Sequence, residues 1–490
     1  MEANRRDFLK GFAWMGAAAM AAGCANGRMR ICSGGTMQGF AAPALKKIRV
    51  GVVGLGMRGR GAVHRLANIP GVQVCALCDL LQDRIDVQQK WLKDNGKPAA
   101  KQFCGSKDEW RKMCAWDGID VVYNTTSWDM HVPIALEAME CGKHVMIEVP
   151  AAMYLEDCWA LVETSERTRK HCMQLENCCY GECEMFALNL CRQGILGELV
   201  HGEGAYIHDL RSLCYRPSAK GGYYNDWRLR WNMDHKGNQY PTHGLGPICQ
   251  YMNINRGDKF DYLVSLESNQ FNYEAYGLAM HGAGDWRHTA KVGMGDMNTT
   301  LVKTALGRSI MIQHDVSSPR PYSRINKITG TKGTFTGGAF SEPERMATSE
   351  WPARMGWGEK PGDEVHSYFS PKKSAEMREK YKHPLWKAAG EIAQKVGGHG
   401  GMDFLMDLRW AYCLQNGLPL DMDVYDLAAW CSICGLSERS VKNRSNSVDV
   451  PDFTHGGWRT AEPLGIVNVD LAKMGVGSDS VKADKSALNV

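Results

Sequence analysis

The sequence predicts an α/β fold class: a doubly wound parallel sheet followed by an α+β domain with a mainly antiparallel sheet. Three observations lead to this prediction. A glycine-rich turn separates an apolar run from a helical pattern near residue 54, and strand and helix patterns then alternate to about residue 177. From there to about residue 455 the two kinds of pattern are mixed without strict alternation.

The glycine-rich turn follows the first predicted strand, Ile48–Val53. Gly54, Gly56 and Gly59 have the G-x-G-x-x-G spacing and open a helical pattern. Glycines so placed permit a tight turn, close approach of the backbone to a pyrophosphate and close helix–strand packing. A second predicted strand ends at Asp79, about 20 residues beyond the last glycine, where an acidic side chain binds the ribose 2′-hydroxyl of NAD. The turn therefore predicts a Rossmann-type domain that binds NAD.

The alternation continues beyond Asp79. Strands are expected at 118–126, 143–150 and 171–177, with helices at about 131–141 and 154–170. Because parallel strands are joined through crossover helices, this order indicates a parallel sheet with helices on both faces.

The second half predicts a different architecture. An amphipathic helix is expected at 185–196, strands of an antiparallel sheet at 263–272, 297–307 and 309–316, and a hairpin at 330–338. Residues 341–395 are rich in proline, charge and tryptophan with weak periodicity, so we expect long ordered loops there.

Composition limits the partners. The 490 residues are 44% hydrophobic and 23% charged with a net charge of +4, and no basic run suggests nucleic acid as a partner. Eighteen cysteines include two C-x-x-C pairs, Cys75/Cys78 and Cys431/Cys434. The first pair lies on a predicted strand and the second has no further pair nearby, so we expect buried free thiols and no metal site.

The first residues resemble an export signal. Arg5 and Arg6, followed by Asp-Phe-Leu-Lys and a short apolar stretch, match the twin-arginine signal for proteins that cross a membrane already folded. We therefore expect the twin-arginine export machinery as a partner and a periplasmic or membrane-anchored location. Two processing alternatives remain: a lipid anchor at Cys24, or cleavage near Ala44. In both, residues 24–46 are expected to lie outside the fold.

Several motifs resemble a known superfamily. The glycine-rich turn, the acid after the second strand, the turn Thr126–His131 and the block Glu148–Pro150 resemble the glucose–fructose oxidoreductase/inositol dehydrogenase superfamily. That superfamily usually has Glu-Lys-Pro at the last block, and its lysine often assists proton transfer. Val149 occupies the lysine position here and cannot transfer a proton.

Blocks in the second half sharpen the resemblance. Residues 202–211, 223–232, 237–247 and 397–410 are similar to glycoside hydrolase family 109, whose members are NAD-dependent α-N-acetylgalactosaminidases. The resemblance covers about residues 47 to 455, and Tyr-Pro-Thr-His at 240–243 is its most specific element.

The resemblance implies a reaction and a cofactor. It implies hydrolysis of terminal α-linked N-acetylgalactosamine through transient oxidation at C3, elimination of the aglycone, water addition and re-reduction, with tightly bound NAD recycled in each turnover. One alternative is an NAD(P)-dependent sugar oxidoreductase of the same fold that releases a keto sugar. Another is a sugar-binding protein that keeps NAD for structural reasons only.

The resemblance also implies site residues. Tyr240 and His243 are the catalytic candidates, because they share one face if Pro241 begins a helix. Histidine can accept a proton near neutral pH, whereas the tyrosine would need a lowered pKa, and which of them handles the C2 proton stays open. The glycines around His399 permit a turn, and we leave this histidine out of the catalytic set. The positions that match the family's cofactor contacts are Gly54, Gly56, Met57, Arg58, Gly59, Asp79, Trp128, Asp129, Met130, His131, Glu148, Val149 and Asn177. Arg58 can either pair with a phosphate or point to solvent. The positions that match sugar contacts are Tyr206, Arg228, Tyr240, Pro241, Thr242, His243 and Tyr322.

Four segments follow from these observations. We expect a leader at 1–46, an NAD-binding domain at 47–178, a substrate domain at 179–455 and a peripheral tail at 456–490. A homo-oligomer is also expected, because the second sheet often mediates dimerisation in the superfamily.

Overall fold

A computed structural model describes residues 35–337, 343–349 and 365–475 of the chain. Its strands form two sheets: a six-stranded sheet in the order β3-β2-β1-β4-β5-β6 and an eight-stranded sheet in the order β13-β12-β11-β7-β10-β9-β8-β14. This arrangement confirms the predicted fold class. The predicted export motif and Cys24 lie outside the described residues. Among the helices of the described ranges, none has the length and apolar character needed to cross a membrane.

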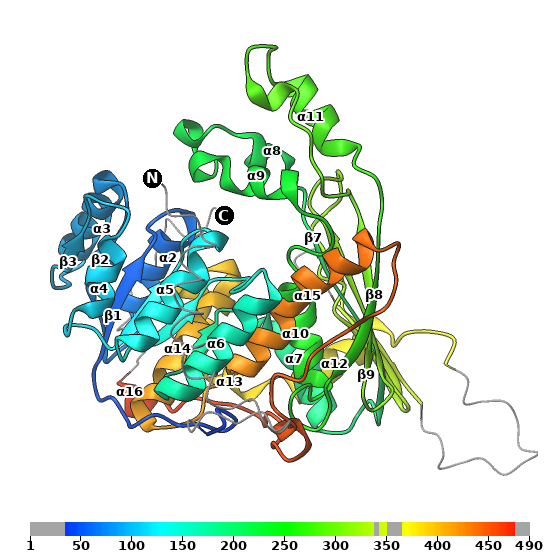
Figure 1. Cartoon of the computed structure of the whole chain (residues 1–490). Coiled ribbons are helices and arrows are strands. Elements are labelled where there is room, and N and C mark those ends of the chain that lie inside the picture. Colours follow the sequence, from blue (N-terminus) through cyan, green and yellow to red (C-terminus); the bar gives the residue numbers. More distant parts are fainter. Residues whose placement is uncertain (1–34, 338–342, 350–364, 476–490) are drawn as a thin grey trace, which may run out of the picture. The chain divides into compact units, whose positions relative to one another are not determined.

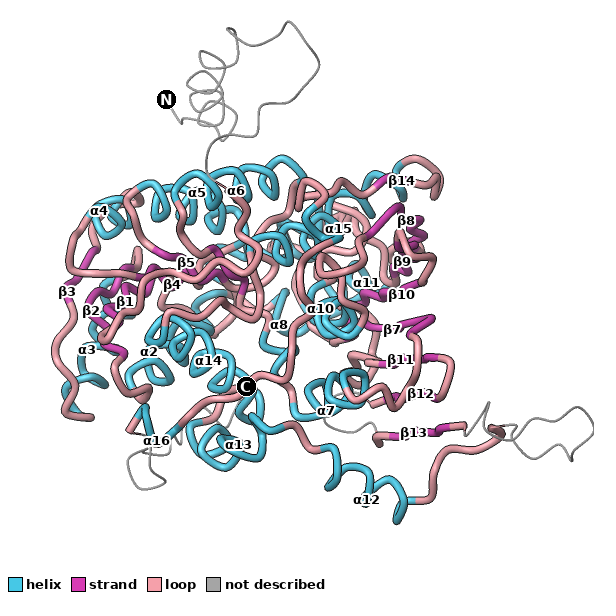
Figure 2. The backbone as a smooth tube through the Cα atoms, turned by 90° about the horizontal axis from the view of Figure 1, so that it is seen from below, coloured by secondary structure: helices cyan, strands magenta, loops and turns pink. Residues whose placement is uncertain are grey.

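The six-stranded sheet is parallel throughout. Its strands are β1 (Ile48–Val53), β2 (Val72–Cys78), β3 (Lys101–Phe103), β4 (Val121–Asn124), β5 (His144–Ile147) and β6 (Cys172–Gln174). Its helices are α2 (Met57–Ala67), α3 (Gln82–Asp94), α4 (Glu109–Ala115), α5 (Trp128–Glu140) and α6 (Leu155–Thr168). Figure 2 shows α5 and α6 on one side of these strands and α2 with α14 (Met402–Asn416) on the other. The strand order reverses between β1 and β4, which is the point where ligands bind in open α/β sheets.

The eight-stranded sheet is antiparallel except where β7 pairs with β10. Its strands are β7 (Leu199–Ile207), β8 (Phe260–Glu267), β9 (Asn298–Thr304), β10 (Ser309–Asp315), β11 (Lys327–Gly330), β12 (Gly333–Thr336), β13 (Arg345–Thr348) and β14 (Val448–Asp449). The helices α10 (Thr242–Tyr251) and α15 (Val424–Lys442) pack on this sheet, with α7 (Glu182–Arg192) beside α10 (Figure 1). The remaining α-helices are α8 (Arg211–Tyr215), α9 (Trp227–Asp234), α11 (Asn272–Met280), α12 (Pro371–Tyr381), α13 (Pro384–Val396) and α16 (Leu471–Met474).

Two glycines allow α10 to lie directly against β7. A Cβ atom on Gly204 of β7 would come within 2.3 Å of the Gly244 carbonyl oxygen, and one on Gly244 within 2.2 Å of the Ala205 nitrogen. Larger side chains at either position would push the helix away from the strand. This close approach brings the start of α10 beside the end of β7, where several of the predicted site residues lie.

The expectation of loops over residues 341–395 was wrong for its second part. Helices α12 and α13 occupy it, and each begins with a proline at its first position. Proline is tolerated there because the first helical N–H groups have no partner within the helix. In α13, Leu385, Ala389 and Ile392 are buried at helical spacing. The prolines were interpreted as loop signals although they mark helix starts.

Part of the predicted leader also belongs to the fold. Met37 and Ala42 are buried in the main core, although residues 24–46 were expected to lie outside it. The Leu45 N–H donates to the Leu414 carbonyl of α14 at 2.9 Å. The described part of the predicted tail packs as well, since Trp458 and Met474 are buried. The cysteines of the described residues all carry free thiols, in agreement with the prediction.

A buried polar network joins the parallel sheet to α14. Arg65 of α2 donates through Nε to Asp407 Oδ2 at 2.8 Å, and the Tyr123 hydroxyl donates to Asp407 Oδ1 at 2.9 Å. Arg65 is 4% exposed, and burial raises the pKa of the Asp407 carboxyl above its usual value. The guanidinium is therefore needed to keep a buried carboxylate charged.

We expect Arg65→Met to lower the free energy of unfolding by about 3–5 kcal/mol, because it leaves Asp407 buried without its cation. Urea denaturation of the purified protein measures this loss. Arg60→Met is the control, because Arg60 lies on the exposed face of the same helix and its replacement should change stability by no more than about 0.5 kcal/mol. Similar losses in the two variants would contradict the prediction.

Candidate active site

The predicted sugar contacts and one predicted cofactor contact form a single aromatic cluster. The rings of Tyr206, at the end of β7, and Tyr240, before α10, are stacked with centroids 4.3 Å apart. Trp128, at the start of α5, lies 6.0 Å from Tyr240, and Tyr322 lies 6.2 Å from Tyr206. The fold therefore brings residues from both predicted domains to the carboxyl ends of the parallel strands.

Arg228 of α9 lies inside this cluster. Its guanidinium carbon is 5.0 Å from the Trp128 ring centroid and 5.1 Å from that of Tyr240, and Nη1 donates to the Tyr223 hydroxyl at 3.1 Å. Nε and Nη2 are buried and have no hydrogen-bond partner among the described residues. Cation–π contacts stabilise the charge, while the N–H groups of these two nitrogens are left unused. Such donors are suited to the oxygen atoms of a sugar.

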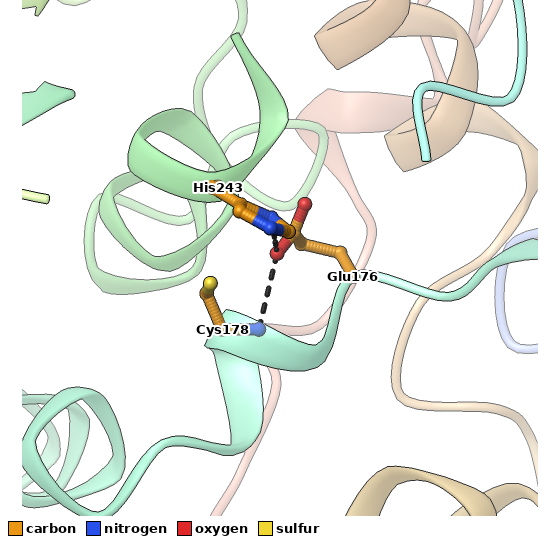
Figure 3. Close-up of side chains that lie close together, drawn as sticks. All are labelled: Glu176, Cys178 and His243. Atoms are coloured by element: carbon orange, nitrogen blue, oxygen red, sulfur yellow. Dashed lines mark hydrogen bonds and ion pairs between the residues drawn. The ribbon is translucent and has the colours of Figure 1, made fainter. Parts of the chain in front are cut away.

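His243 is held by a buried carboxylate that the sequence analysis missed. Its Nδ1 lies 2.8 Å from Oε1 of Glu176, and the same oxygen accepts the main-chain N–H of Cys178 at 3.0 Å (Figure 3). Glu176 is fully buried in the loop after β6. Burial opposes its ionisation, but the His243 charge and hydrogen bond outweigh it and hold the pKa of Glu176 below its usual value. Nδ1 therefore carries the proton toward Glu176, which leaves Nε2 as the free nitrogen.

The neighbouring thiol makes this a set of three metal-binding residue types. The ligand atoms of Glu176, Cys178 and His243 all lie within 4.8 Å of one another (Figure 3). The imidazole and the carboxylate already bind each other, and burial raises the pKa of the Cys178 thiol well above its usual value. The arrangement is thus explained by the histidine–carboxylate pair, and the absence of a metal site stays a prediction.

Tyr240 does not have the lowered pKa that a tyrosine would need to act as a base. Burial, reinforced by the neighbouring Tyr206, raises its pKa well above the usual value, and the nearby Arg228 charge only partly opposes this. The phenol is therefore protonated near neutral pH unless a bound group adds positive charge. Pro241 and Thr242, which complete the Tyr-Pro-Thr-His block, are buried at the start of α10, and the helix begins one residue after Pro241.

A second tyrosine–histidine pair lies beside the first. The Tyr206 hydroxyl is 3.0 Å from Nδ1 of His208. Burial lowers the pKa of His208 to about 4, with the Arg228, His243 and His399 charges acting in the same direction. His208 is therefore neutral near pH 7 and can accept the Tyr206 hydroxyl proton in a hydrogen bond. It lies two residues from Tyr206, directly after β7, and although the block 202–211 contains it, the sequence analysis did not select it as a site residue.

His399 lies near this cluster in a loop of glycines. Its Nδ1 is 3.0 Å from Oδ2 of Asp403 and 3.2 Å from Nη1 of Arg58. Its side chain is 29% exposed, whereas Asp403 is fully buried at the start of α14. The glycine pattern drew attention to His399, and its carboxylate partner Asp403 lies four residues further along the chain.

The glycine-rich turn has the shape that a dinucleotide requires. Gly54 has a φ of +87°, and a Cβ atom on Gly59 would meet the Gly54 carbonyl oxygen at 2.0 Å. A Cβ atom on Gly56 would meet no protein atom closer than Arg84 at 3.6 Å, so this backbone is open to a ligand. Asp79 lies directly beyond β2, and its Oδ2 accepts the Leu55 N–H at 2.6 Å. The residues present therefore fit NAD, with its pyrophosphate at the N-terminus of α2.

Arg58 pairs with two carboxylates. It donates to Glu148 at 2.9 Å and to Asp403 at 3.1 Å, and its side chain is 32% exposed. A contact with a cofactor phosphate stays a prediction. Both acids lie at the carboxyl side of the sheet, and Asn177 also donates to Asp403. These contacts fix the loop that leads into α2.

The other predicted cofactor residues shape the neighbouring turns. The His131 ring bonds the Pro150 carbonyl at 2.9 Å and the Thr126 carbonyl at 3.0 Å. The Val149 carbonyl accepts the Trp128 indole N–H at 3.3 Å. The remaining three side chains differ in exposure: Met57 and Asp129 are exposed, and Met130 is half-buried.

Fold and site together define a two-domain protein of oxidoreductase fold with an NAD-binding Rossmann domain. Levoglucosan dehydrogenase, solved in complex with NADH and L-sorbose, superposes with a TM-score of 0.60 at 18% identity, over 83% of this chain and 100% of its own. An oxidoreductase domain protein from Kribbella flavida gives a TM-score of 0.62 at 16% identity, over 83% and 100% of the two chains. At these identities the likeness concerns the fold alone.

The family follows from sequence similarity. Residues 48–175 match the oxidoreductase family, NAD-binding Rossmann fold, and residues 180–460 match the glycosyl hydrolase 109 C-terminal domain. Glycosyl hydrolase family 109 protein 1 of Bacteroides fragilis (strain YCH46) is 46% identical over 424 residues, which cover 86% of this chain and 88% of that protein. A family 109 protein of Shewanella pealeana is 43% identical over 477 residues, or 95% and 100% of the two chains. The chain belongs to glycosyl hydrolase family 109.

The open backbone at Gly56 yields a prediction about the cofactor. We expect Gly56→Ala to keep the thermal stability of the protein but to weaken NAD binding at least tenfold, or about 1.4 kcal/mol. The added methyl group clears the protein but occupies the surface that the pyrophosphate approaches. Calorimetric titration with NAD and thermal unfolding measure the two effects. Gly284→Ala, where the methyl group meets open space, is the control. Unchanged NAD affinity in Gly56→Ala would contradict the assignment.

Proposed function

We propose that this chain hydrolyses terminal α-linked N-acetylgalactosamine, using tightly bound NAD that is recycled in each turnover. One observation carries the proposal. His243, oriented by buried Glu176, lies in one aromatic cluster with Trp128 of the NAD-binding domain. This arrangement supports a role for His243 as proton acceptor beside the end of the Rossmann sheet where a nicotinamide is expected.

The cofactor and the protein have separate tasks in this proposal. When bound, NAD would supply a hydride acceptor for C3 of the sugar and, in its reduced form, the donor that restores C3. His243 takes the C3 hydroxyl proton through Nε2, and Glu176 stabilises the resulting imidazolium. Arg228 binds sugar oxygens with its unused donors, while the walls of Trp128 and Tyr206 exclude water.

Two further proton transfers need groups of their own. Removal of the C2 proton falls to the stacked pair Tyr206 and Tyr240, in which Tyr206 gives its hydroxyl proton to Nδ1 of His208 through their hydrogen bond and then takes the C2 proton in its place. Departure of the aglycone needs a proton donor near the mouth of the site. His399 suits this task, because its side chain is partly exposed and paired with the Asp403 carboxylate.

Val149 favours hydrolysis over the alternative, a dehydrogenase that releases a keto sugar. The superfamily lysine that assists proton transfer is replaced by this apolar side chain, which is 5% exposed. An exported dehydrogenase would also need fresh NAD after each turnover, whereas net hydrolysis returns the cofactor to its starting state. Both considerations support the hydrolase.

Proton NMR of an aryl α-N-acetylgalactosaminide with purified enzyme in D₂O, without added NAD, tests the proposal. We expect free N-acetylgalactosamine that carries deuterium at C2, because the C2 proton is removed and then replaced from solvent. Release of the sugar without deuterium would contradict the elimination route. A 3-keto sugar with an intact aglycone would replace the proposal by the dehydrogenase, and an unchanged substrate would contradict both.

Variants separate catalysis from cofactor retention. Glu176→Gln keeps a hydrogen-bond acceptor but removes the charge, so we expect kcat to fall on the order of 100-fold with NAD still bound. His243→Ala and Tyr240→Phe should likewise lose turnover and keep NAD. Cys178→Ser is the control, because it lies beside the carboxylate and its main-chain N–H bond to Glu176 remains. Full activity in His243→Ala would contradict the role of His243 as proton acceptor, whereas loss of turnover with NAD still bound would contradict a protein that only binds sugar.

A further inference from the structure

Residues 36–46, here called the N-terminal strap, are bound to the body of the protein. Met37 is 3% exposed and Ala42 is 4% exposed, and both belong to the main hydrophobic core. Phe40 and Leu45 pack against the same core. Four side chains of the strap thus have partners in the fold, although the strap is the last part of the predicted leader.

Hydrogen bonds fasten the strap to separate elements. The Met37 N–H donates to the Tyr425 hydroxyl of α15 at 3.0 Å, and Gln38 Nε2 donates to the Asn255 carbonyl at 2.9 Å. Arg169, after α6, donates to the Thr36 carbonyl at 2.8 Å and lies over the Phe40 ring at 4.3 Å. The Leu45 N–H completes the set through Leu414 of α14. Segments distant in the sequence therefore meet the strap along its whole length.

The strap also lines a cavity. Its residues 36–40 border a cavity of about 490 Å³ together with His171, Leu420, Met422 and residues 460–465. Removal of the strap would expose the apolar side chains of this cavity to water. The strap is accordingly part of the folded enzyme and not a linker.

We infer that the exported protein retains residues 36–46, and that any processing of the leader takes place upstream of Thr36. Cleavage near Ala44 would remove Met37 and Ala42 from the core together with three of the fastening hydrogen bonds. A lipid anchor at Cys24 leaves the strap intact, since residues 25–35 separate the two. The inference rests on the packing of the strap and is independent of the proposed catalytic chemistry.

The mass of the exported protein tests this inference. The full chain, with its own leader, is produced in a bacterium that has the twin-arginine machinery, and the protein recovered from the cell envelope is analysed by intact-mass spectrometry. We expect an N-terminus at or upstream of Thr36. A lipid-modified Cys24, a cut between residues 24 and 36 and an uncut chain would each support retention of the strap. An N-terminus anywhere from Met37 to Lys47 would overturn it.

Two neighbouring alanines provide a matched test of docking in the full chain. Ala42 is buried, whereas Ala41 is exposed. We expect Ala42→Asp to lower the midpoint of thermal unfolding by at least roughly 4 °C, because it buries a charge, and Ala41→Asp to change it by no more than about 1 °C. Equal midpoints in the two variants would overturn the docking of the strap.

Discussion

The geometry of the candidate active site depends on one buried carboxylate, that of Asp403. Three loops converge on it: Arg58 from the glycine-rich turn, Asn177 from the loop after β6, and His399 from the glycine loop before α14. Burial alone would favour the neutral acid, but the Arg58, His399 and Arg65 charges hold its pKa well below the usual value. Because the charge is stable only with these partners in place, the carboxylate fixes the three loops relative to one another.

A second constraint, the close packing of α10 on β7, brings His243 and Tyr240 to their partners. The absence of side chains at Gly204 and Gly244 lets α10 lie directly against β7. His243 thereby reaches Glu176 in the loop after the parallel sheet, and Tyr206 reaches Tyr240. One loop thus contributes both the carboxylate that pairs with His243 and the amide that donates to Asp403.

The features that could be predicted from the sequence are those that depend on residues close together in the chain. The glycine spacing, the strand–helix alternation and the Tyr-Pro-Thr-His block each depend on neighbouring residues, and the fold class and family follow from them. The sequence did not reveal Glu176 or Asp403, because each acts on a residue that only the fold brings near: His243 lies 67 positions from Glu176, and Asp403 lies 345 positions from Arg58. The predictions from local pattern were wrong where one residue type is typical of two different structures. The prolines that begin α12 and α13 are also typical of loops, and the small apolar residues before Leu45 are typical of leaders and of buried segments alike.

If the chain is exported as proposed, the same contacts require it to fold first. Arg58 of the cofactor turn is held by Asp403 near the other end of the chain, and Trp128 meets Tyr240 across the two predicted domains. A cofactor enclosed by these contacts can be held firmly only after most of the chain has been made and packed. NAD is a metabolite of the cytoplasm, so a chain that crossed a membrane unfolded would complete its site where the cofactor is scarce. A route for folded proteins, which Arg5 and Arg6 predict, lets the cofactor be captured first, and a reaction that restores NAD in each turnover then needs no further supply.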